Sequence, residues 1–169
     1  TTHAITDFAL DFIKEGKVGK ASDPFFLYVA YNAPHYPLHA PREEVLKYQG
    51  KYMDGWQKVR DDRFVRLKEL GIIDADAEFS NSEKVIGGWD QLSEAEKIDM
   101  DLRMATYAAM IDVVDQQVGR LVETLKDQGI YEDTLIIFLS DNGACPFDRT
   151  RGPTKKNNYM PWDERSYWC

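Results

Sequence analysis

The sequence is poor in cysteine, has no long apolar run and carries no excess of positive charge. Its two cysteines, Cys145 and Cys169, allow one disulfide at most and do not form a CxxC pair. No apolar run approaches the ~20 residues that span a bilayer, so we expect no transmembrane segment. The formal net charge of −8 repels phosphate backbones, so we expect no nucleic-acid partner.

The start of the chain lacks an initiator methionine and also lacks the basic and apolar stretches of a signal peptide. We therefore expect the chain to begin inside a longer gene product. What is present is the composition of a globular domain. Hydrophobic residues make up 43% of the chain and aromatic residues 12%, which provides apolar area for a core.

The spacing of the apolar residues predicts helices and two strands. Two short continuous apolar runs, 25–30 and 134–139, are typical of strands buried on both faces. Three prolines exclude a helix or a central strand from 33–41, which we interpret as a loop. The remaining predicted elements are helices over roughly 4–15, 42–49, 54–70 and 96–128, and an irregular surface segment over 74–92.

The longest predicted helix follows a capping box, Ser93-Glu94-Ala95-Glu96, in which Ser and Glu satisfy backbone N–H groups reciprocally. An apolar stripe with a period of about 3.6 residues runs along this helix. The stripe consists of Met104, Tyr107, Ile111, Val114, Val118, Leu121, Val122 and Leu125. We expect its Val114, Val118 and Leu121 side to pack on a sheet, because helices alternating with buried strands predict an α/β fold with a mostly parallel sheet flanked by helices.

Residues capable of chemistry follow both predicted strands, and ligands of open α/β sheets collect at such strand ends. Asp141 and Asn142 offer the oxygen ligands that Ca²⁺ or Mg²⁺ prefers, although Asn142-Gly143 is also a common turn signal. His35 lies on a proline-stiffened loop, where an imidazole suits hydrogen bonding to an anion or a leaving group. The alternative is an extended surface loop with incidental histidines.

Several segments resemble the type I sulfatase, or arylsulfatase, family. The segment FFLYVAYNAPHYPLHAP (25–41) carries the strongest likeness, and the others follow it in the family's order over nearly the whole chain. These other segments are Lys47-Tyr48 through Trp56, Lys68-Glu69-Leu70-Gly71, Tyr107-Ala108-Ala109-Met110-Ile111-Asp112, and Leu135 through Asn142-Gly143.

The resemblance implies an alkaline-phosphatase-like α/β fold and the cleavage of sulfate esters. It implies a formylglycine nucleophile and a divalent metal, usually Ca²⁺, with Mg²⁺ as the alternative. His35 matches a histidine that contacts the sulfate or its leaving oxygen, and Asp141 and Asn142 match the second pair of metal ligands. Nothing is carried over to His39. The substrate would be a sulfated small molecule or polysaccharide, and the location periplasmic or secreted.

The chain also departs from the family's pattern. It lacks the C/S-x-P-x-R nucleophile motif, the paired N-terminal aspartates and the late lysine, and Cys145-Pro146 places proline one position too early for that motif. We therefore expect residues 1–169 to be a partial sulfatase catalytic domain that is inactive alone and part of an active full-length enzyme. The alternatives are a phosphoester or phosphonate hydrolase of the same superfamily, and a catalytically dead carbohydrate-binding relative.

Overall fold

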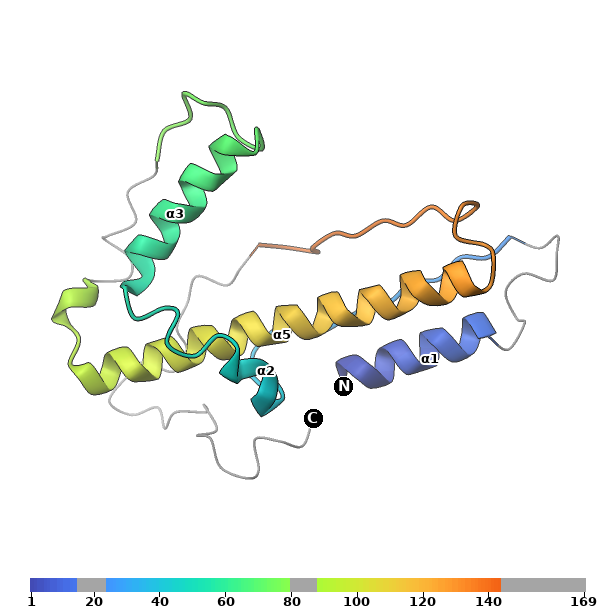
Figure 1. The fold of residues 1–169 in the computed structure, drawn as a ribbon, viewed down its shortest axis with the longest axis horizontal. Helices are drawn as coiled ribbons and strands as arrows, with labels where there is room; N and C mark the ends of the chain where they lie inside the picture. The colour runs from blue at the N-terminus through green and yellow to red at the C-terminus, as the bar shows by residue number, and fades with distance from the viewer. Residues whose placement is uncertain (15–23, 80–87, 144–169) are drawn as a thin grey trace. The chain divides into compact units, whose positions relative to one another are not determined.

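The structure is a computed structural model that describes residues 1–14, 24–79 and 88–143. Its elements, drawn in Figure 1, are the helices α1 (Thr2–Lys14), α2 (Arg42–Leu46), α3 (Gly55–Glu69) and α5 (Glu94–Asp127) and the 3₁₀ turn η1 (Trp89–Gln91). The chain divides into two compact units, one of residues 1–40 and 110–169 and one of residues 41–109. Cys145 and Cys169 lie outside the described residues.

The helices agree well with the sequence-based prediction. The helix expected over 4–15 is α1, which begins two residues earlier, and the helix expected over 54–70 is α3. The helix expected over 42–49 is regular only as far as Leu46 and continues as a series of turns. Within the described ranges, no helix combines the length and low polarity that crossing a bilayer demands.

The capping box at the start of α5 is confirmed. The Ser93 N–H donates to a Glu96 carboxylate oxygen at 2.9 Å, and the Glu96 N–H donates back to the Ser93 hydroxyl at 3.4 Å. The helix ends before Gly129, whose φ of 70° favours glycine because it lies in the left-handed region. The predicted boundaries, 96–128, differ from the observed Glu94–Asp127 by two residues or fewer.

The buried face of α5 differs from the predicted stripe. Ile111 is 46% exposed and Met104 is also exposed, whereas Val114 is buried. The buried residues are a mixture of Ala, Asp, Thr and Gln with Met, Val and Leu, so the buried face is less apolar than the predicted stripe. The buried residues are Asp101, Ala105, Thr106, Ala109, Met110, Val113, Val114, Gln117, Thr124 and Leu125.

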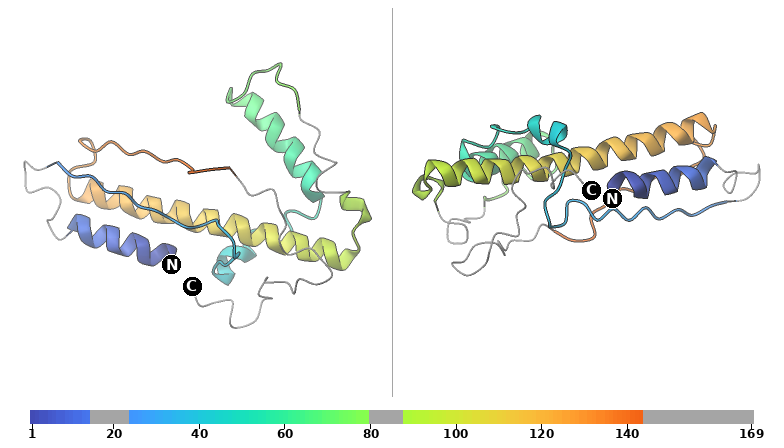
Figure 2. Two further views of the ribbon diagram at one scale, coloured as in Figure 1. Left: turned by 180° about the vertical axis from the view of Figure 1, so that it is seen from behind. Right: turned by 90° about the horizontal axis from the view of Figure 1, so that it is seen from below.

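In the first unit, α1 lies alongside the C-terminal part of α5 (Figures 1 and 2). It buries Thr6, Ala9, Leu10 and Ile13, which recur at the spacing of one helix face. At the edge of this contact, the Arg120 guanidinium donates to the Asp7 carboxylate at 2.8 Å.

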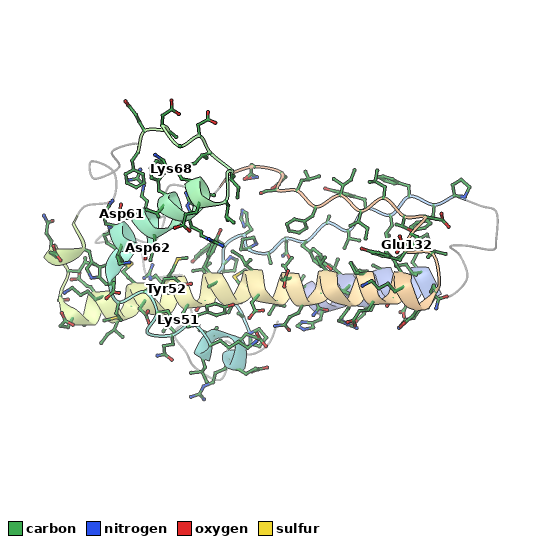
Figure 3. The ribbon with its side chains drawn as sticks, turned by 45° about the horizontal axis from the view of Figure 1, so that its top comes forward. Lys51, Tyr52, Asp61, Asp62, Lys68 and Glu132 are labelled. Carbon is green, nitrogen blue, oxygen red and sulfur yellow. The ribbon has the colours of Figure 1, made fainter. Side chains whose placement is uncertain are left out.

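Two extended segments of the same unit, 24–33 and 134–140, run in the same direction back along α5 (Figures 1 and 3). Within the described residues neither forms a strand, so the parallel sheet remains a prediction. Burial alternates along 25–31: every second side chain is half-buried, and those between, such as Phe26 at 88% exposure and Tyr28 at 78%, are open.

The prediction that both segments are buried on both faces is therefore wrong for this structure. The residues of 135–139 are all exposed as well. A strand is buried on both faces only when it has neighbours in a sheet and a layer against each face. The described part of the chain supplies neither the ladder partners nor the second layer.

In the second unit, a buried carboxylate holds the turns after α2 against α5. Asp101 is only 4% exposed, and its two oxygens accept the Gly50 N–H at 2.7 Å and the Tyr52 N–H at 2.9 Å. Tyr52 lies next to Lys51 in Figure 3. Burial raises the pKa of the Tyr52 phenol above its ordinary 10.0, and the charge of Asp101 raises this pKa further.

A second contact of this unit joins α3 to η1. The Trp56 and Trp89 rings meet edge to face, with their centroids 5.0 Å apart. Gly55 has a φ of 88°, and a Cβ there would lie 2.6 Å from Trp89 Cγ. Glycine at this position therefore serves both the backbone conformation and the close approach of the Trp89 ring.

We predict that Asp101→Asn destabilises the full-length protein by about 2 kcal/mol, because an amide can replace only one of the two accepting oxygens. Urea unfolding measures the loss, and hydrogen exchange of the Gly50 and Tyr52 amides locates it. Asp115→Asn, an exposed position of the same helix, is the matched control. Equal amide exchange in the two variants would contradict the prediction.

A second prediction concerns alkaline stability. Below pH 10 the Tyr52 phenol is neutral in both states, so its contribution to stability is fully present. Above pH 10 the unfolded state loses its proton first, and this contribution is lost as the pH rises through the folded pKa. Tyr52→Phe should therefore reduce the loss of stability between about pH 9 and about pH 11. Urea unfolding at both pH values measures the change in the free energy of unfolding, and Tyr28→Phe is the control. The same change in the wild type, Tyr52→Phe and Tyr28→Phe would refute the prediction.

Candidate functional site

His35 lies on a tight loop directly after the extended segment 24–33. The His35 N–H donates to the Asn32 carbonyl at 2.9 Å and closes a turn. The neighbouring Ala33–Pro34 and Tyr36–Pro37 peptide bonds are cis. The side chain of His35 is exposed, so its ring is open to a ligand. The loop predicted from the prolines is confirmed.

One hydrogen bond fixes which ring nitrogen of His35 is available. His35 Nδ1 lies 2.6 Å from the Tyr36 carbonyl oxygen. A carbonyl oxygen only accepts, so Nδ1 carries the proton in this contact. Nε2 is then the nitrogen left for a ligand. It accepts a hydrogen bond when the ring is neutral and donates one when the ring is protonated.

Asp141 and Asn142 lie in a turn after the second extended segment, and both are exposed. The Asn142 N–H donates to Asp141 Oδ1 at 3.0 Å, and the Ser140 hydroxyl donates to the Asn142 carbonyl at 2.6 Å. The turn therefore exists, as the Asn-Gly signal predicts. It does not exclude metal binding, because a carboxylate has further lone pairs beyond the one used here.

The two halves of the candidate site belong to the same unit of the chain. Each follows an extended segment, and the two segments run in the same direction (Figure 3). The turn brings Asp141 and Asn142 together, while the approach of His35 to them stays a prediction. Across 1–14, 24–79 and 88–143, no group of three or more His, Cys, Asp or Glu side chains is arranged to hold a metal ion.

The other two histidines have no assigned role. His39 is half-buried, four positions after His35, and His3 is exposed in the first turn of α1.

One contact near the His35 loop is absent from the sequence-based prediction. The Thr6 hydroxyl of α1 and the Tyr31 hydroxyl lie 2.7 Å apart. The only sequence signal for this contact is that Thr6 stands among the apolar positions of an amphipathic helix. A threonine there is equally compatible with ordinary packing in the core.

Comparison with known proteins identifies the family. The Sulfatase family profile matches residues 1–166. The chain is 36% identical to an uncharacterized sulfatase of Schizosaccharomyces pombe over 81% of this chain and 25% of that protein. It is 40% identical to an arylsulfatase of Klebsiella aerogenes over 77% of this chain and 28% of that protein. It is 31% identical to the multifunctional alkaline phosphatase superfamily protein PehA of Trinickia caryophylli over 82% of this chain and 26% of that protein.

The chain thus spans about a quarter of the length of these relatives. The match nevertheless covers nearly all of its own residues, including both segments that hold the candidate site. Family membership implies the α/β fold of the alkaline-phosphatase type, with which the order of helices and extended segments is compatible. The chain belongs to the sulfatase family.

Proposed function

We propose that the full-length protein containing this chain hydrolyses sulfate monoesters, and that residues 1–169 supply part of its active site. The observation that carries the proposal is the family match over residues 1–166, which includes a likeness to an arylsulfatase. The His35 loop and the Asp141–Asn142 turn add side chains suited to that chemistry. The substrate class is a sulfated small molecule or a sulfated polysaccharide.

His35 is the residue of this chain proposed to act on the substrate. Its Nδ1 proton is held by the Tyr36 carbonyl, so Nε2 is the atom that meets the ester. When protonated, Nε2–H donates to the oxygen that leaves sulfur and hands over its proton as the bond breaks. Neutral Nε2 accepts a proton at the end of the cycle.

Asp141 and Asn142 are proposed to hold a divalent metal. A carboxylate and an amide carbonyl are hard oxygen donors, so this donor set fits Ca²⁺ better than a softer metal, with Mg²⁺ as the alternative. Two residues do not complete six or more oxygen ligands, so further ligands would come from other parts of the full-length protein. When bound, the metal would stabilise the negative charge of the sulfate group.

The nucleophile is also proposed to come from elsewhere in the full-length protein. The chain contains no C/S-x-P-x-R motif, from which the sulfatase formylglycine is made. We therefore expect the isolated 169-residue chain to be inactive.

A phosphoester hydrolase is the second candidate, favoured by the likeness to the alkaline phosphatase superfamily protein PehA. The kcat/KM of the full-length protein for 4-nitrophenyl sulfate and 4-nitrophenyl phosphate distinguishes the two. A preference for the sulfate supports the first candidate, and a preference for the phosphate overturns it in favour of the second.

We predict that His35→Ala in the full-length protein lowers kcat by about 10²–10⁴-fold, the usual contribution of a general acid. Metal content should be unchanged, because His35 acts on the substrate. Steady-state kinetics and elemental analysis measure the two effects. His3→Ala, at an exposed position of α1, is the control. A His35→Ala enzyme with normal turnover would remove His35 from the mechanism.

We predict that Asp141→Ala abolishes activity and lowers Ca²⁺ affinity, because it removes a charged metal ligand. Calorimetric titration with Ca²⁺ and the sulfatase assay test the two parts separately. Asp133→Ala, an exposed carboxylate before the same segment, is the control. If Asp141→Ala binds Ca²⁺ as tightly as Asp133→Ala does, the turn is not a metal site.

A further inference from the structure

The contact between Thr6 and Tyr31 links α1 to the segment that carries His35. Thr6 is completely buried, and Tyr31 is half-buried with its hydroxyl 2.7 Å from Thr6 Oγ1. Tyr31 is one of the half-buried positions of the alternating segment, two residues before the turn begins at Ala33. A hydroxyl pair at this depth is a specific contact, because leaving either group without a partner carries a desolvation penalty.

The direction of this hydrogen bond follows from the second contact of Thr6. The Thr6 hydroxyl lies 3.2 Å from the Thr2 carbonyl oxygen, to which it donates its only proton. Thr6 Oγ1 is therefore the acceptor toward Tyr31, and the Tyr31 O–H is the donor. A phenylalanine at position 31 would remove the donor and keep the ring.

Thr6 belongs to the buried face of α1, together with Ala9, Leu10 and Ile13. Next to it, Asp7 accepts a hydrogen bond from Arg120 at 2.8 Å, and Arg120 also donates to the buried Gln117 side chain at 2.6 Å. The Tyr31 hydroxyl is thus hydrogen-bonded to α1, which lies alongside α5 with this face buried and with the exposed Asp7–Arg120 pair joining the two helices.

Because Tyr31 is next to the turn that contains His35, holding its side chain also restrains that turn. The next residue, Asn32, provides the carbonyl that accepts the His35 N–H. Fixing Tyr31 therefore fixes one end of the turn whose other end is His35. Only residues 32–34 separate the anchored tyrosine from the histidine.

We propose that Tyr31, held by Thr6, is a positioning residue that sets the placement of the His35 ring. This inference rests on the proposed function, in which His35 Nε2 serves the leaving oxygen. A misplaced ring donates poorly to that oxygen, and an error of 1 Å in a reacting group can cost about 10²-fold in rate. The loss should be greatest for esters whose leaving group most needs a proton.

The test compares Tyr31→Phe and Thr6→Val with two controls in the full-length protein. Thr6→Ser keeps the hydroxyl, and Tyr28→Phe removes a hydroxyl from an exposed position of the same segment. We expect Tyr31→Phe and Thr6→Val to lower kcat for phenyl sulfate by about tenfold, with little change in KM. This loss is smaller than the 10²-fold that a displacement of about 1 Å can cost. For 4-nitrophenyl sulfate, whose leaving group needs no proton, the loss should be smaller. Both controls should retain wild-type kcat.

A double-mutant cycle separates positioning from general destabilisation. In the His35→Ala background, Tyr31→Phe should cost nothing further, because the group that it positions is absent. An equal loss in both backgrounds would overturn the proposal. So would an unchanged kcat in Tyr31→Phe, or a loss of thermal stability with no dependence on the leaving group.

A spectroscopic measurement keeps this inference distinct from the proposed function. The ¹⁵N spectrum of the His35 ring should report an Nδ1–H tautomer in the wild type and a shifted or broadened signal in Tyr31→Phe. If the wild type hydrolyses no sulfate ester but the ring signal still responds, the proposed function fails and the positioning role stands. If the ring signal is identical in the two proteins, the positioning role fails.

Discussion

Extended backbone with no strand partner among the described residues is the constraint on which the rest of this structure depends. The segments 24–33 and 134–140 carry a donor and an acceptor at nearly every residue, and within the described residues they form no ladder. Their apolar side chains are also left uncovered, since Leu135 is 86% exposed and Phe26 is 88% exposed. One helix cannot bury such segments on both faces, and it offers an extended segment no backbone partners for a ladder. Neighbouring strands are the physical remedy.

The same constraint explains why the candidate site is only partly formed. His35 and the Asp141–Asn142 turn each follow one of these segments, so the pairing that aligns the segments would also set the spacing between the two groups. In a parallel sheet, the carboxyl ends of the strands meet at one edge. The family match gives this arrangement its support. The local geometry of each group, by contrast, is already present without the sheet.

Much of this local geometry could be predicted from the sequence. The capping box at Ser93 and the proline loop around His35 depend on neighbours within four residues, and both are confirmed. The buried face of α5 could be predicted only in part: Val114 and Leu125 of the stripe are buried, but hydrophobicity favoured the exposed Ile111 over the buried Ala105. Which face is buried depends on what packs there, and that is a property of distant residues. The sheet was not confirmed for the same reason.

The Thr6–Tyr31 bond is the clearest case of information that only the structure holds. Its partners are 25 positions apart, and each is ordinary in its own sequence context. A buried threonine in α1 satisfies its own hydroxyl through the Thr2 carbonyl and still has an acceptor lone pair for Tyr31. The helix thereby fixes a point beside the His35 loop at the cost of one polar position in its buried face. A valine there would pack comparably but would offer Tyr31 no acceptor, so the choice of threonine has a reason in the placement of the loop.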